Sequence, residues 1–315
     1  MKKLIVLGII MAVMVLVAAP VHAQTPTTDL KPTFISPTPG LYVHGWPAFT
    51  VTYPKEWVEV PLAGPGAVFE AVAARPDSYA SIVLAIGVSP SVLPLEDWAK
   101  LFMPVWVEYF TDIKVLSDKP SQLKGGTLAR EVEFDFVPKV DPSGRSIKNG
   151  TKQNGVLLVA KKDATWVSIM LGDDRGKPGE DLRRIAYSLT FQPGREEPVK
   201  VPPDVRAFLD MYCTDVVSHD VTAMMAHFSD RFRHSGMNKA FMEQFWRNDP
   251  ASPIQRGTIS CEATVTVFEA QGDKAYVDGF MLDKARGDAN ALKVPMVFQQ
   301  IINEHGQWKW YGNQK

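Results

Sequence analysis

The stretch "AREVEFDFV", residues Ala129–Val137, decides much of the fold because apolar and acidic residues alternate along it. Successive side chains of a β-strand point to opposite faces of a sheet, so this pattern predicts a strand with one apolar face on a core. The side chains expected to face that core are Val132, Phe134 and Phe136, and those expected to face solvent are Glu131, Glu133 and Asp135.

The segments on both sides of this stretch contain further strand and helix patterns. "FTVTY" (49–53) alternates, and "SIVLAIGV" (81–88) is apolar enough for a strand that is covered on both faces. "PLEDWAKLFMPVWVEYF" (94–110) has apolar residues at helical spacing. "GVLLVAKKDATWVSIML" (155–171) predicts two strands, and "GEDLRRIAYSLTF" (179–191) predicts a short closing helix. Together they predict a sheet-rich domain with helices.

This order of elements resembles the PsbP-like α/β/α sandwich. The resemblance rests on "FTVTYPKEW" (Phe49–Trp57), on Gly125 and Gly126 before the central strand, and on "IAYSLTF" (Ile185–Phe191). That family includes extrinsic photosystem subunits and bacterial envelope proteins that bind or support partners. The resemblance therefore implies a PsbP-like antiparallel-sheet domain at residues 48–191 with a binding role, and it brings no catalytic motif.

The pattern changes after residue 202. Three segments have helical spacing and are followed by four strand-like segments that are separated by glycine-containing turns. Asp220 is placed to cap the second helix, and Ser235 or Asn238 is placed to cap the third. The expected helices are 203–219, 220–229 and 237–248, and the expected strands are 257–270, 274–283, 291–304 and 307–314.

Three helices followed by an antiparallel meander resemble the nuclear-transport-factor-2-like, or SnoaL-like, cone fold. The carriers are "FLDMYCTDVVSHDVTAMMAHFSDRF" (208–232), "GMNKAFMEQFW" (236–246) and "GQWKWYGNQ" (306–314). The resemblance implies a cone-shaped α+β barrel at residues 203–315, so the fold class expected for the chain is α+β. Some members of that family are dehydratases or isomerases with an Asp or His in a central cavity. Many others only bind ligands or dimerise.

The first 23 residues have the layout of a secretory signal peptide. Two lysines precede the apolar run 4–19, and cleavage is expected after Ala23. A helix that crosses a bilayer needs roughly 20 apolar residues, so an uncleaved anchor is the less favoured alternative. We expect a periplasmic or secreted protein without stable membrane insertion after cleavage. The Pro- and Thr-rich residues 24–47 are expected to form a flexible tail, and residues 192–202 are expected to form a linker.

The charge balance and the histidine spacing exclude several kinds of partner. Removing Lys2 and Lys3 with the signal segment leaves 32 of 34 basic residues, against 35 acidic residues. Nucleic acid is bound by a basic surface that displaces counterions, so no nucleic-acid partner is expected. The sequence has no pair of histidines at i, i+4 and no Cys-x-x-Cys motif, so neither a metal nor another cofactor is expected.

The candidate catalytic residues are His227, His234 and Asp278. The two histidines lie in "HFSDRFRHSGMNKAF" (227–241), which is either part of an active site or the joint between two helices. Asp278 interrupts an apolar strand, where a partly buried carboxylate would have a raised pKa. No spaced set of partners supports catalysis, so the joint is favoured for the histidines. For Asp278, an outward-facing side chain or a bulge at Gly279 is favoured.

Two further hypotheses concern the second domain. Several of its aromatic residues are expected to line one concave apolar pocket for a small ligand, with a filled core as the alternative. These residues are Tyr212, Phe228, Phe245, Phe280, Phe298 and Trp308. Cys213 and Cys261 point into the same helix-on-sheet core, the latter on an apolar face with Ile259, so a disulfide is favoured over two buried thiols.

The favoured function is a non-catalytic, exported binding or accessory protein of the cell envelope. Its partner would be an unknown envelope protein or a small apolar ligand, and a homodimer through the sheet of the second domain is an alternative. The other functions left open are a dehydratase or isomerase that uses a His or Asp of the second domain, and an accessory or inhibitory subunit of a secreted complex.

Overall fold

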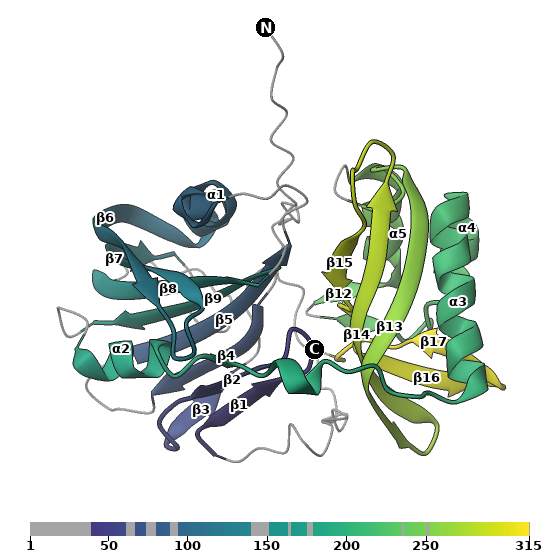
Figure 1. The fold of residues 1–315 in the computed structure, drawn as a ribbon, viewed down its shortest axis with the longest axis horizontal. Coiled ribbons are helices and arrows are strands. Elements are labelled where there is room, and N and C mark those ends of the chain that lie inside the picture. The colour runs from purple at the N-terminus through teal and green to yellow at the C-terminus, as the bar shows by residue number, and fades with distance from the viewer. Residues whose placement is uncertain are drawn as a thin grey trace, which may run out of the picture. The chain divides into compact units, whose positions relative to one another are not determined.

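The structure, a computed structural model, describes residues 39–60, 67–73, 80–88, 94–139, 151–162, 165–174, 179–234, 236–249 and 252–314. The expected signal peptide and residues 24–38 of the expected tail lie outside this part of the chain. The fold is mixed α and β, and the chain divides into two units (Figure 1). Among the described residues, 39–44 and 48–192 belong to the first unit, and 45–47 and 193–314 belong to the second.

The first unit contains a seven-stranded antiparallel sheet with the strand order β3-β4-β5-β9-β8-β7-β6. A three-stranded sheet of order β1-β2-β10 accompanies it. The bounds in chain order are β1 (Leu41–His44), β2 (Phe49–Thr52), β3 (Trp57–Glu59), β4 (Ala67–Ala73), β5 (Ala80–Val88), η2 (Leu95–Asp97), α1 (Trp98–Tyr109), β6 (Phe110–Gln122), β7 (Leu128–Pro138), β8 (Gln153–Lys162), β9 (Thr165–Asp173), α2 (Glu180–Ala186) and β10 (Thr190–Phe191).

Strand β1 corrects the expected extent of the tail, because residues 41–44 are paired with β2 instead of forming part of a flexible segment. The ring of Tyr42 contacts Phe69 at 4.7 Å, and the ring of His44 stacks on Phe49 at 4.9 Å. These aromatic contacts stabilise the strand. They could not be predicted from the sequence, in which the segment simply continues a proline-rich stretch.

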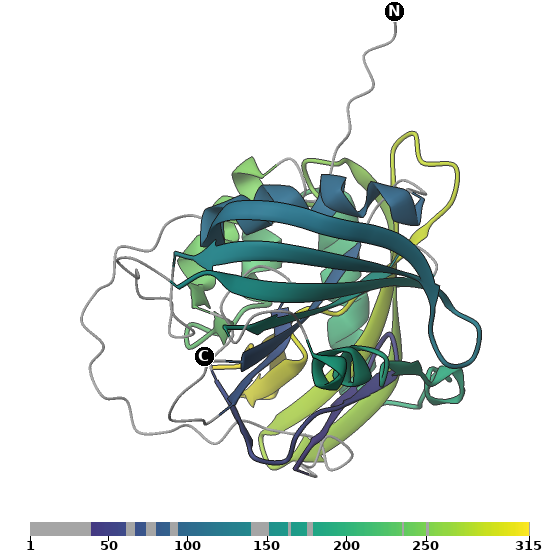
Figure 2. The same cartoon turned by 90° about the vertical axis from the view of Figure 1, so that its left-hand side faces the viewer.

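The large sheet is covered by a helix on each face (Figures 1 and 2). Trp98 and Trp106 of α1 pack against the apolar residues of β7 that include Phe134. On the other face, Leu182 and Ile185 of α2 pack in a second core, together with residues of β2, β5, β8 and β9. The sheet therefore lies between two apolar layers.

Strand β7 shows where the alternation pattern was right and where it was wrong. Val132, Phe134 and Phe136 are buried in one core, as the sequence predicts. The expectation that Glu131, Glu133 and Asp135 face solvent is wrong for two of them, because Glu131 is 2% exposed and Asp135 is 6% exposed. The second face is covered as well, and alternation along one strand reports only that its two faces differ.

Burial of Glu131 is balanced by three donors. Lys119 of β6 lies 3.0 Å from its carboxylate, Arg183 of α2 donates to it at 3.3 Å, and the Tyr187 hydroxyl also donates to it. Burial raises the pKa of Glu131, but the hydrogen bonds from Tyr187, Lys119 and Arg183 outweigh this effect and leave the pKa below its usual value. The charged group links β6, β7 and α2.

We expect Glu131→Gln to lower the free energy of unfolding by about 2 kcal/mol at pH 7, because charge-assisted hydrogen bonds become neutral while the shape is kept. Glu96→Gln is the control, because Glu96 is exposed and lies 3.9 Å from its partner Arg130. The pKa of Glu131 is lowered in the folded state, so its contribution is present above the usual carboxyl pKa and is lost as the pH falls through the folded value. Urea unfolding at pH 7 and at pH 4 measures both effects, and an equal loss in the two variants would contradict the prediction.

Strand β6 forms one edge of the large sheet among the described strands. Its pairing with β7 is interrupted by register shifts between Thr111 and Lys114 and between Val115 and Ser117. Asp112 has a positive φ of 51°, and Pro120 has no amide to donate. The edge is therefore irregular along its length.

The second unit contains an antiparallel sheet of order β13-β14-β16-β17, in which β15 also pairs with β14. Figure 1 shows α3 and α4 along one side of the curved strands β13 and β14. The bounds are η3 (Pro193–Arg195), α3 (Pro203–Ser218), α4 (Val221–Ala226), β11 (Arg233–His234), β12 (Met237–Asn238), α5 (Lys239–Asn248), β13 (Thr258–Gln271), β14 (Lys274–Ala285), β15 (Leu292–Pro295), β16 (Gln300–Glu304) and β17 (Gln307–Trp310).

Helix starts in this unit follow the capping residues in the sequence. The Asp220 carboxylate accepts a hydrogen bond from the Ala223 amide at 3.0 Å, and the Asn238 side chain accepts one from the Phe241 amide at 2.9 Å. Both bonds satisfy amides that the first turn of a helix leaves free. The caps predicted at Asp220 and Asn238 are therefore confirmed.

None of the helices in the described part of the chain is long and apolar enough to cross a membrane.

The segment expected to be a linker is attached at several points. Gln192 donates its amide to the Ala48 carbonyl at 2.7 Å within the first unit, and Val199 donates its amide to the Val265 carbonyl at 2.8 Å within the second. Val201 packs against the core of the second unit. The side chain of Val199 remains exposed, so the backbone rather than an apolar contact holds this part of the segment.

Candidate functional site

His227 lies directly after α4 and faces α3. Its Nε2 atom is 2.7 Å from Oδ2 of Asp215, and its ring meets those of Phe208 and Tyr212 edge to face at 5.8 Å. Its backbone carbonyl accepts the Trp310 amide at 2.7 Å. These contacts join α4 to α3 and β17, so they give His227 a structural role.

His234 lies on β11, in the short hairpin that β11 and β12 form between α4 and α5. Its ring is half-buried against Phe232 and Phe298, with centroids 6.5 and 5.5 Å away. The Nδ1 atom is buried and has no hydrogen-bond partner among the described residues. Burial lowers the pKa of His234 to about 4, so the ring is neutral at pH 7.

Asp278 of β14 is fully buried, with 0% of its surface exposed. Its carboxylate accepts hydrogen bonds from the Gly279 amide at 2.7 Å, the Tyr276 hydroxyl at 3.1 Å and the Gln299 side chain at 3.4 Å. The Trp46 amide, which belongs to the same unit, also donates to it. Burial outweighs these donors and raises the pKa of Asp278 to about 7.

The packing around Asp278 leaves little room. A Cβ atom at Gly45 would lie 2.0 Å from Oδ2 of Asp278, so only glycine fits at that position without displacement. Arg195 is near enough for the charges of Asp278 and Tyr276 to act on it, although burial lowers the pKa of Arg195. The carboxyl group is thus held in a tightly packed polar cluster.

The three candidate catalytic groups have different surroundings. Ala275 and Val277 of β14 belong to the core that faces the helices, so Asp278 lies on the opposite face of the strand. His234 contacts residues of the helix-facing core, and His227 is paired with Asp215. No shared hydrogen bond or ring contact joins any two of these three groups among the described residues.

The aromatic residues expected to line a pocket lie on different faces of the sheet. Tyr212, Phe228 and Phe298 pack edge to face in the core. The ring centroids of Tyr212 and Phe228 are 6.5 Å apart, and those of Phe228 and Phe298 are 5.3 Å apart. Phe280 lies on the opposite face and contacts Trp46 at 5.0 Å. Phe280 therefore lies apart from the core that Tyr212, Phe228 and Phe298 share.

The other two predicted lining residues lie at the margin of that core. Phe245 of α5 is partly buried and contacts Trp246 edge to face at 5.2 Å. Trp308 is also partly buried, and its Nε1 atom donates to the Asp204 carboxylate at 2.7 Å.

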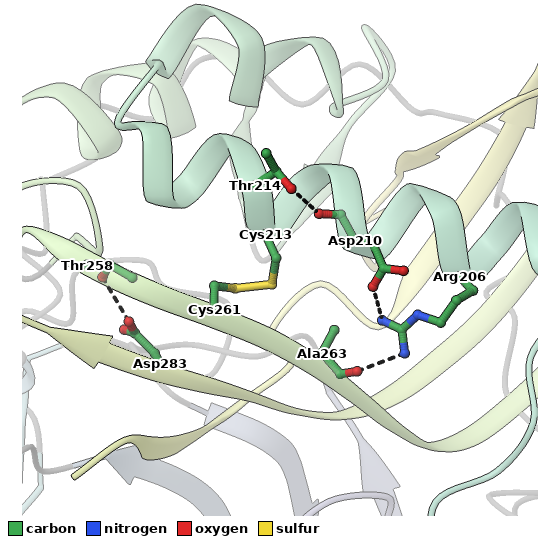
Figure 3. The surroundings of a disulfide bond; sticks show 8 residues. All are labelled: Arg206, Asp210, Cys213, Thr214, Thr258, Cys261, Ala263 and Asp283. Atoms are coloured by element: carbon green, nitrogen blue, oxygen red, sulfur yellow. Dashed lines mark hydrogen bonds and ion pairs between the residues drawn. A yellow bond between two sulfur atoms is a disulfide. The ribbon is translucent and has the colours of Figure 1, made fainter.

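Cys213 of α3 and Cys261 of β13 form a disulfide, with their Cα atoms 5.1 Å apart (Figure 3). The expected neighbour Ile259 is 47% exposed and does not share the apolar face, because a register shift between Thr258 and Ser260 turns it outward. Figure 3 also shows Arg206 of α3, which donates to the Ala263 carbonyl at 2.8 Å and so adds a second link from α3 to β13.

The sequence did not point to a pocket in the first unit, with a cavity volume of about 420 Å³. One wall is the turn after β2, including Tyr53 and Glu56, and continues into Trp57 of β3. We call it the α2 pocket, because its other wall is the face of α2 that includes Leu182 and Ile185. About 125 residues separate the two walls, so no local motif marks it.

The Tyr53 side chain in this pocket is fixed by its neighbours. Its ring contacts Phe69 at 5.0 Å, and its hydroxyl donates a hydrogen bond to the Glu59 carboxylate. Burial and the charge of Glu59 raise the pKa of Tyr53, so the phenol is neutral at pH 7. A wall held in this way loses little entropy when a ligand binds.

The solved structures that are similar to this chain include three with low TM-scores. No family model matches the chain, and no curated protein matches it. The solution structure of cyanobacterial PsbP from Synechocystis sp. PCC 6803 is 12% identical with a TM-score of 0.35, covering 48% of this chain and 91% of that one.

Two other solved structures also have TM-scores below 0.5. A crystal structure from Bacteroides thetaiotaomicron VPI-5482 is 13% identical with a TM-score of 0.34, covering 86% of this chain and 88% of that one. A protein of unknown function from Pseudomonas aeruginosa is 13% identical with a TM-score of 0.25, covering 42% of this chain and 80% of that one. The structural similarity to PsbP is weak, and none of these likenesses supports an argument about activity.

Proposed function

We propose that this chain is a non-catalytic, exported binding or accessory protein of the cell envelope, in which a PsbP-like domain precedes a SnoaL-like domain. The observation that carries the proposal is the separation of His227, His234 and Asp278. Proton-transfer catalysis needs an acid or base within hydrogen-bond reach of a substrate, with a partner to orient it. His227 pairs with Asp215, but its ring packs against Phe208 and Tyr212, and Asp278 is enclosed on the far face of β14. No contact among the described residues brings either group to the other.

Export is supported by two features. The Cys213–Cys261 disulfide suits an oxidising compartment such as the periplasm, because cytosolic thiols are kept reduced. The first 23 residues have the charge and apolar pattern of a cleaved signal. A binding role is supported by the α2 pocket, whose wall combines fixed aromatic and aliphatic side chains with a few charged groups.

The proposal is tested in cells that produce the full chain. We expect the mature protein to begin at Gln24, to lie outside the cytoplasm, and to be recovered with an envelope protein or ligand after cross-linking in intact cells. His227→Gln, His234→Gln and Asp278→Asn should each retain that association. A cytoplasmic chain with an intact N-terminus would contradict export, and a cross-linked sample with no associated molecule would contradict the binding role. Sedimentation of the same sample checks the alternative of a homodimer.

A further inference from the structure

The charges that line the α2 pocket are unevenly compensated. Asp181 and Arg184 of α2 form an ion pair at 2.6 Å, so they largely neutralise each other. The Glu56 carboxylate on the opposite wall makes no hydrogen bond or ion pair with any described residue. The described lining thus carries two carboxylates and one guanidinium, so its net charge is negative.

Aromatic and aliphatic surfaces accompany that charge. Tyr53 is half-buried and Trp57 is buried, and both line the same wall as Glu56. Leu182 and Ile185 are buried residues of the facing wall. A carboxylate beside aromatic rings attracts a cation both through its charge and through the negative faces of the rings.

We propose that the α2 pocket binds an organic cation carried on an apolar stem, an alkylammonium or alkylguanidinium group such as the side chain of lysine or arginine. The cationic head lies at Glu56, and the stem lies between the ring of Tyr53 and the aliphatic side chains of α2. Long basic side chains divide in this way between an apolar stem and a charged end. This inference rests on the proposed function, because it assigns a ligand class to a binding site.

Two features of the pocket fit this ligand better than an anion or a wholly apolar molecule. Arg184 could attract an anion, but the Asp181 carboxylate 2.6 Å away offsets its positive charge. A wholly apolar molecule would gain nothing from the charge of Glu56, whereas a cation is attracted by it. A single basic side chain fits within about 420 Å³.

The test is a titration of the isotope-labelled full chain by nuclear magnetic resonance, with the indole signal of Trp57 assigned through Trp57→Phe. The probes are N-acetyl-lysine amide and its neutral isostere N-acetyl-norleucine amide. At low ionic strength we expect the lysine probe to bind about five-fold more tightly, and we expect added salt to reduce the difference. Equal affinity of the two probes, or no saturable shift with either, would overturn the proposal.

Variants separate the role of Glu56 from a general effect of charge. Glu56→Gln should remove the preference for the lysine probe. It should fold normally because Glu56 is exposed and has no hydrogen bond or ion pair with a described residue. Glu180→Gln is the matched control, because it removes an exposed carboxylate from α2 that does not line the pocket. A preference that survives Glu56→Gln, or that Glu180→Gln also removes, would overturn the assignment of the cation to Glu56.

A second pair of probes distinguishes the source of the cation. Hexylamine represents a small free amine, and the capped tripeptide Gly-Lys-Gly represents a lysine within a polypeptide. Tighter binding of the tripeptide points to a protein partner, and tighter binding of hexylamine points to a small molecule. If all cations fail while the cross-linked partner persists in cells, the inference fails and the proposed function stands. If the cations bind while no partner or natural ligand is recovered, the proposed function fails instead.

Discussion

Asp278→Asn is expected to stabilise the protein more at pH 8 than at pH 4. The change in the free energy of unfolding that the substitution causes should be larger at pH 8 by up to about 4 kcal/mol. This free-energy difference follows from a carboxyl pKa of about 7 in the folded chain against an ordinary value of 3.8. Asparagine resembles the protonated acid in shape and cannot ionise. The variant therefore avoids the cost of a buried charge while keeping a group that hydrogen-bonds to Tyr276 and Gly279.

The sign follows from which state holds the proton more tightly. The folded state has the higher pKa, so the stability due to protonated Asp278 is fully present below pH 3.8 and is lost as the pH rises towards 7. Above pH 7 the loss is complete. Urea unfolding of both proteins from pH 4 to pH 8 measures the difference, and parallel stability curves would show that Asp278 is ionised in the folded chain throughout this range.

Removing the Cys213–Cys261 disulfide is expected to lower the free energy of unfolding by about 4 kcal/mol. The bond closes a loop with a sequence separation of 48 residues, and in the chain-entropy model such a loop restricts the unfolded chain by this amount. The double variant Cys213→Ser/Cys261→Ser should show the loss with and without reductant. The native protein should show it only after reduction.

The control for this prediction is thiol titration of the unfolded native protein without reductant. No reactive thiol is expected, and two per chain would contradict the disulfide. Ser260→Ala is a suitable comparison variant, because Ser260 lies beside Cys261 on β13 with its side chain exposed. A loss of stability in the double variant no larger than that in Ser260→Ala would show that the bond contributes little.

Local patterns predicted those parts of the fold that depend on neighbouring residues. The apolar face of β7 and the caps at Asp220 and Asn238 follow from periodicity and from hydrogen bonds to amides three positions away. Such features need no knowledge of distant segments. The short β1 strand was missed because its stability comes from ring contacts with Phe49 and Phe69 rather than from its own composition.

The candidate sites were harder to predict because they depend on how distant segments meet. The acidic face of β7 is covered because α2 brings Arg183 to Glu131. The sequence of the strand itself does not indicate that Arg183 is the partner. The α2 pocket joins residues near 55 with residues near 183 for the same reason. The face of β14 that carries Asp278 was predictable from alternation with Val277, whereas its complete burial was not.

The irregular edge at β6 has a consequence for how this chain behaves in a crowded compartment. Amyloid-like growth begins when one molecule adds a straight strand to the free edge of another. The shifts at Thr111–Lys114 and Val115–Ser117 interrupt the row of donors and acceptors that such a strand would need, and Pro120 removes one more donor. Although Val115 and Leu116 are exposed and apolar, this edge is a poor template for fibril seeding.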